Sequence, residues 1–92
     1  MAVHANQSIA VQSDSVAFNQ NTNTEVDFGA KIKHLIVKTS ADVRLGFDAA
    51  ANASDFLLEA ADRTVRISPC ECSKLYVLGN SGTGTVYFIA SR

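Results

Sequence analysis

Alternation of apolar and polar residues is the feature that most constrains what this chain can fold into. In residues 42–48, DVRLGFD, every second side chain is apolar, and the positions between them are charged residues or glycine. An extended strand with this pattern buries one face and leaves the other in water. The predicted inward residues are Val43, Leu45 and Phe47, and the predicted outward residues are Asp42, Arg44, Gly46 and Asp48. Residues 64–68 repeat the alternation with Val65 and Ile67 inward, and Pro69 ends that strand because proline cannot donate a ladder hydrogen bond.

Further short segments complete an all-β pattern. SIAVQ, SVAFN, EVDFG and FLLEA are predicted as strands, and KIKHLIVKT at 31–39, apolar on both faces at its centre, is predicted as one strand in the middle of a sheet. The alanine-rich residues 49–54 allow one short helical turn at most, since Asn52 and Ser54 interrupt them. Turn signals recur about every 8 to 12 residues. We therefore expect a single domain over residues 1–92: a small antiparallel β-sandwich or barrel of about seven to eight strands.

Composition limits the classes of partner. The net charge of −1 and a pI near 6.0 do not suit a nucleic-acid-binding protein, which normally carries a basic patch. We expect residues 1–7, with His4, to form a flexible segment or a docking arm. That end lacks the basic start and apolar core of a signal peptide, and no run approaches the ~18 apolar residues of a membrane span, so no membrane association is expected. A hydrophobic share of 47% with only 18% charged residues favours assembly, and a homo-oligomer is expected.

The segment GNSGTG at 79–84 has the glycine content of a phosphate-binding loop. Such a loop requires a following helix, and a lysine followed by Ser or Thr. Here the β-rich TVYFIA follows instead. We expect a hairpin that joins KLYVL to TVYFI, with glycines that supply positive φ angles.

No residue set predicts catalysis, a cofactor or a metal. Cys70 and Cys72 in PCECS are two apart, so in an extended strand they share a face, and a bond between them would close a small, strained ring. We expect reduced thiols. Structural zinc sites use cysteine pairs spaced by two to four residues, and neither His4 nor His34 has a second histidine nearby. Asp42 and Asp48 are expected on one solvated strand face, without the facing partner that a glycosidase needs.

The C-terminal strand is apolar on both faces. In TVYFIA, one side carries Val86, Phe88 and Ala90, and the other carries Tyr87 and Ile89. A two-layer sandwich has no further layer to cover the second side, so we expect Tyr87 and Ile89, with Tyr76 and Leu78 on the paired strand, to lie at a contact with another protein chain.

Three segments carry a resemblance to a known class of proteins. KHLIVKTSADVRLGFDAAANASDFLLEA, VRISP and LYVLGNSGTGTVYFIA together resemble the small β-rich virion proteins encoded among the head genes of tailed bacteriophages. The resemblance covers roughly residues 30 to 90. It implies a capsid decoration or minor head protein without catalysis, which binds the major capsid protein or another virion protein. It also implies assembly in the host cytoplasm and a final location in the virion.

Two other classes remain open. A glycan-binding β-sandwich on the virion surface would show Tyr76 or Tyr87 at the border of a groove. An enzyme would show a close cluster of Cys, His and Asp side chains in a cleft.

Overall fold

The described residues of the protein form an eight-stranded β-sandwich. The computed structural model describes residues 11–62 and 64–92, and all strand pairs in it are antiparallel. The strands are β1 (Val11–Phe18), β2 (Thr24–Ile32), β3 (His34–Thr39), β4 (Val43–Phe47), β5 (Phe56–Leu58), β6 (Val65–Ile67), β7 (Cys72–Gly79) and β8 (Gly84–Ser91). The predicted all-β sandwich is thus confirmed. Residues 1–7, where an arm is predicted, lie outside the described residues.

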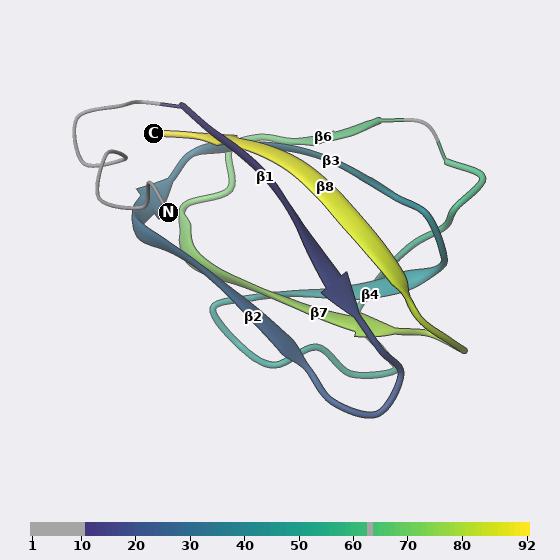
Figure 1. The fold of residues 1–92 in the computed structure, drawn as a ribbon. Helices are drawn as coiled ribbons and strands as arrows, with labels where there is room; N and C mark the ends of the chain where they lie inside the picture. The colour runs from purple at the N-terminus through teal and green to yellow at the C-terminus, as the bar shows by residue number, and fades with distance from the viewer. Residues whose placement is uncertain (1–10, 63) are drawn as a thin grey trace.

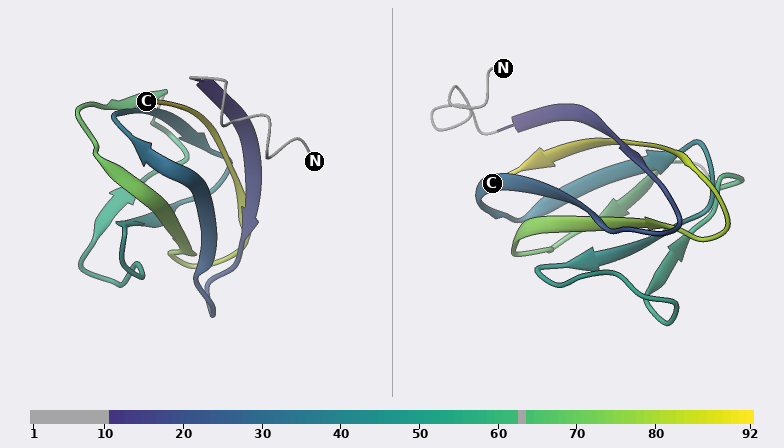
Figure 2. Two further views of the ribbon diagram at one scale, coloured as in Figure 1. Left: turned by 90° about the vertical axis from the view of Figure 1, so that its left-hand side faces the viewer. Right: turned by 60° about the horizontal axis from the view of Figure 1, so that its bottom comes forward.

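The strands form two sheets of four. One has the order β1-β8-β3-β6 and is called the β8 sheet below; the other has the order β2-β7-β4-β5 and is called the β7 sheet. Apart from β4 and β5, consecutive strands belong to different sheets. Figure 1 shows the two sheets as layers, and Figure 2 shows them from two further directions. This strand order is that of a jelly roll, in which two Greek keys interlock.

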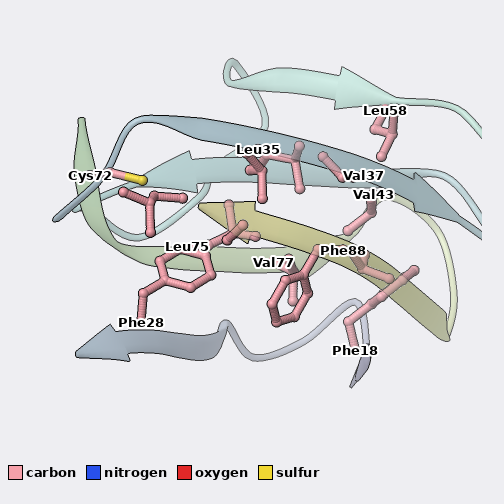
Figure 3. Packing of buried hydrophobic residues seen from close by; sticks show 14 residues of the cluster. Phe18, Phe28, Leu35, Val37, Val43, Leu58, Cys72, Leu75, Val77 and Phe88 are labelled. Carbon is pink, nitrogen blue, oxygen red and sulfur yellow. The ribbon is translucent and has the colours of Figure 1, made fainter. Parts of the chain in front are cut away.

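The core lies between the two sheets. Leu35 and Val37 from the β8 sheet pack in one cluster with Leu75 and Val77 from the β7 sheet, and all four are fully buried (Figure 3). The rings of Phe28 and Phe88 pack edge to face, with centroids 5.6 Å apart. Each sheet therefore has one dry face.

The predicted inward residues all contact this core, but to different degrees. Val43 and Leu45 are buried, whereas Phe47, Val65 and Ile67 are half-buried and pack against the cluster. Val65 and Ile67 belong to β6, an edge strand, which has a neighbour on one side only. The edge position explains their partial exposure.

The prediction of one strand over 31–39 is wrong. The chain bends at Lys33, so that Lys31 and Ile32 end β2 in the β7 sheet while β3 begins at His34 in the β8 sheet. Two backbone bonds hold this crossing: the Lys33 amide donates to the Ser91 carbonyl, and the Cys70 amide donates to the Lys33 carbonyl, both at 2.8 Å. The segment was also predicted to lie in the middle of a sheet, and this is true of β3, which lies between β8 and β6.

The predicted hairpin at GNSGTG is also wrong. β7 and β8 lie in different sheets and do not pair, so the segment is a crossover between layers. Its glycines serve close approach: a Cβ on Gly79 would lie 2.1 Å from the Gly82 carbonyl oxygen, and one on Gly84 would lie 2.7 Å from the Phe18 ring. Among the described residues the glycine with positive φ is Gly29, at 79°.

Gly46 was predicted to face outward into solvent, but it is buried. The loop between β4 and β5 folds back over it, and a Cβ at this position would lie 2.3 Å from the Ala49 carbonyl oxygen. That loop contains a turn and no helix at 49–54, and FLLEA supplies β5 as predicted. The loop therefore covers part of the outer face of the β7 sheet.

Candidate functional site

The outer face of the β8 sheet presents side chains in rows that cross all four strands. Ile89 of β8 lies opposite Ser13 of β1 and Ile36 of β3, and Ile36 in turn lies opposite Arg66 of β6. Because partners in an antiparallel ladder point to the same side, these four side chains share one face. We call them the isoleucine row. Ile89 keeps 44% of its surface exposed.

A second row runs beside the first. Tyr87 lies opposite Ser15 of β1 and Lys38 of β3. Tyr87 is 45% exposed, and the Lys38 ammonium lies 5.6 Å from the centre of its ring, within range of a cation–π interaction. We call these three residues the tyrosine row.

A hollow of about 380 Å³ lies over the two rows. Its lining includes Ser13 and Ser15 from β1, Tyr87 and Ile89 from β8, and Thr64 just before β6. The two serines are small, and the neighbouring tyrosine and isoleucine are large, so the side-chain surface descends toward β1. The hollow thus combines an aromatic ring and aliphatic groups with hydroxyl groups.

Among the residues that the structure describes, no carboxylate forms an ion pair with Lys38 or Arg66 on this face. The ion pair of Lys74 with Glu25, at 3.6 Å, lies on the β7 sheet. Lys38 and Arg66 are therefore available to a ligand or to a partner protein. The carboxylate nearest to the serines is that of Asp14, which lines the hollow and accepts a hydrogen bond from the Ser15 amide at 2.7 Å.

The four predicted contact residues do not form one patch. Tyr87 and Ile89 lie side by side on the β8 sheet, as expected. Tyr76 and Leu78 were expected on the strand paired with theirs; this is wrong, because β8 pairs with β1 and β3 while β7 belongs to the other sheet. Both are half-buried. The Tyr76 hydroxyl donates to Glu25 at 3.2 Å, and burial followed by this contact raises the pKa of the tyrosine.

Asp42 and Asp48 hold loops in place. The Asp42 carboxylate accepts from the Ala60 amide at 2.8 Å, and the Asp48 carboxylate accepts from the amides of Ser73 and Lys74 at 3.0 and 2.9 Å. The Ser73 and Lys74 amides are the main cause of a lowered pKa at Asp48. These contacts give both carboxylates a structural role.

Cys70, Cys72 and His34, which were considered as metal ligands, do not line the hollow. The thiols of Cys70 and Cys72 are 3.2 Å apart, and His34 Nδ1 contacts the Ser68 hydroxyl. Throughout the described part of the chain, no group of three or more His, Cys, Asp or Glu side chains is placed to hold a metal ion.

Comparison with known proteins places the chain in no family: no family model matches it, and no curated protein is significantly similar to it. Among the described residues no helix is long and apolar enough to cross a membrane.

Sequence reasoning identified Tyr87 and Ile89 but missed their neighbours. Ser13 and Ser15 lie in the polar run QSDS and Ile36 lies in the apolar run LIV, so alternation does not mark these three positions as outward. Which strands lie beside β8 follows from the sheet order, and alternation within one strand contains no information about it.

Proposed function

We propose that this protein is a non-enzymatic structural component of a phage virion, a capsid decoration or minor head protein that works by surface contact. The observation that carries the proposal is the outer face of the β8 sheet, where Tyr87 and Ile89 are exposed next to each other. Adjacent exposed apolar side chains on a sheet face favour contact with another protein. The sequence resemblance points to the same role. Jelly rolls occur in viral capsid domains as well as in lectins, but architecture alone does not specify function.

The first test is mass spectrometry of purified virions, with the copy number measured relative to the major capsid protein. A fixed stoichiometric copy number is expected. Absence of the protein from virions that are otherwise complete would refute the proposal.

A second test locates the contact. Ile89→Lys places a charge in the isoleucine row. An apolar anchor of this kind contributes about 1 to 3 kcal/mol to the free energy of association, so the occupancy of the variant protein in virions should fall. Phe56→Lys is the matched control, because Phe56 is 51% exposed on the other sheet. Loss of occupancy in the control alone would place the contact on the β7 sheet.

Glycan binding is a second candidate, favoured by the position of Tyr87 at the border of the hollow. Sugar rings present C–H groups on one face and hydroxyl groups around the edge. The Tyr87 ring and Ile89 suit the former, and the Ser13, Ser15 and Thr64 hydroxyls suit the latter. Lys38 and Arg66 would favour sugars that carry a carboxylate or sulfate group.

Binding of the purified protein to an array of neutral and acidic glycans tests this candidate. Tyr87→Ala should abolish a specific signal, and Tyr76→Ala, on the opposite sheet, should not. Absence of any specific signal would exclude glycan binding and leave the virion role untouched, since that role is measured by occupancy.

A further inference from the structure

The two cysteine side chains face each other at one end of the sandwich. Their Sγ atoms are 3.2 Å apart. In an extended strand, residues two apart would point the same way side by side. Here Glu71 has a left-handed φ of 47°, which turns the backbone between the two cysteines. Cys72 lies at the margin of the core cluster (Figure 3).

We propose that Cys70 and Cys72 are an oxidisable pair that closes a reversible disulfide by exchange with a small-molecule disulfide such as oxidised glutathione. The thiols are already in contact, so closure requires only a short approach of the two sulfurs and no rearrangement of strands. The proposal is independent of the outer face of the β8 sheet, because neither cysteine lines the hollow.

The two thiols are not equivalent. Cys70 is half-buried, whereas Cys72 is 1% exposed. Burial, followed by the hydrogen bond with Cys70, raises the pKa of the Cys72 thiol to about 12. Exchange therefore begins at Cys70, which the reagent can reach, and Cys72 acts second, when its target sulfur is adjacent.

The exchange balances in two steps. The Cys70 thiolate attacks one sulfur of oxidised glutathione, the S–S bond of the reagent breaks, and one glutathione leaves as a thiolate that takes up a proton. The Cys72 thiol then loses its proton and attacks the Cys70 sulfur, and the second glutathione leaves in the same way. Two electrons pass from the protein to the reagent, which ends as two thiols.

The bond should be easily reduced. A disulfide between cysteines separated by one residue closes a small ring, and strained disulfides are more oxidising than structural ones. Its ring also encloses too short a segment to restrict the unfolded chain much. The pair is thus suited to reversible change and not to holding the fold together.

The position of the pair gives the bond a local effect. The Cys70 amide bonds to the Lys33 carbonyl, and Cys72 lies opposite Ile32. Closure would therefore fasten the connection between β6 and β7 beside the bend at which the chain passes from β2 to β3.

The test incubates the full-length protein with graded ratios of oxidised to reduced glutathione, stops exchange with acid, alkylates free thiols and measures intact mass. The wild type should lose two hydrogen atoms and take up no alkyl group. Cys72→Ser should stop at a glutathione adduct on Cys70, and Cys70→Ser should remain largely unmodified. A wild type that stays a dithiol, retains the glutathione adduct or forms cross-linked dimers would overturn the proposal.

Two substitutions of Glu71 test the geometry without removing a thiol. Glycine adopts the left-handed conformation readily, so Glu71→Gly should close the bond as fast as the wild type. Valine adopts it poorly, so Glu71→Val should lower the rate of closure about ten-fold. Equal rates in the two variants would show that the left-handed turn does not bring the sulfurs together.

Discussion

The outer faces of the two sheets differ in how far the protein itself covers them. On the β7 sheet, the β4–β5 loop covers Gly46, and Glu25 contacts both Tyr76 and Lys74. On the β8 sheet, Tyr87 and Ile89 remain exposed, and Lys38 and Arg66 have no carboxylate partner among the described residues. A two-layer protein can cover part of one outer face with its own loop and leave the other face exposed. The second face is where a partner or a ligand is expected.

The inner faces of the two sheets should be equally sensitive to the truncation of a buried side chain. Leu35→Ala in the β8 sheet and Leu75→Ala in the β7 sheet each remove a fully buried side chain, so each should cost about 2 to 5 kcal/mol of unfolding free energy. Phe47→Ala should cost less than either, because Phe47 is only half-buried. Urea unfolding measures all three. A tolerated change at one leucine alone would show that the sheets contribute unequally to the core.

The covered outer face is tested by Gly46→Ala. The new Cβ would meet the Ala49 carbonyl oxygen and the Ala51 amide, so the loop must move, at a cost of about 1 to 3 kcal/mol. Gly82→Ala is the control, because a Cβ there meets nothing within 4 Å. Equal stability of the two variants would mean that the loop does not pack on β4.

Low pH should destabilise the folded protein through protonation of Asp48, the residue that follows β4. Its pKa is lowered from the model-compound value of 3.8, chiefly by the Ser73 and Lys74 amides, so the folded state binds a proton less readily than the unfolded chain. The stabilisation is present above the unfolded pKa and is lost as pH falls through the lower, folded pKa. Unfolding midpoints measured from about pH 7 down to about pH 2 should fall less steeply in Asp48→Asn than in the wild type. Parallel curves would exclude Asp48 as a contributor.

The smallest stability effect is expected on the open face. Ile89→Lys should change the unfolding free energy by no more than about 0.5 kcal/mol, because its side chain is already exposed. Leu78→Lys should cost more, since Leu78 is half-buried and lies opposite Arg44, where a second cation is repelled. Thermal unfolding of both variants measures the difference. A large loss at Ile89 would show that the β8 face is packed and not open.

Alternation within strands determined much of this protein without any structure. It predicted the all-β class, the strands around Val43 and Val65, and the common side of Tyr87 and Ile89 on their strand, because the side-chain period of two depends only on local backbone geometry. The absence of lysine and of a helix after GNSGTG was likewise sufficient to predict a connection between strands and not a phosphate site.

Tertiary structure decided which strands are neighbours. The bend at Lys33 and the crossover at GNSGTG both move the chain from one sheet to the other, and neither leaves a signal in the period of the pattern. The burial of Gly46 and the contact between Cys70 and Cys72 depend on a loop and on a left-handed Glu71, each selected by packing. Strand pairing joins residues far apart in sequence, so the composition of the open face, with Ser13 beside Ile89 and Ile36, exists only once the sheet has formed.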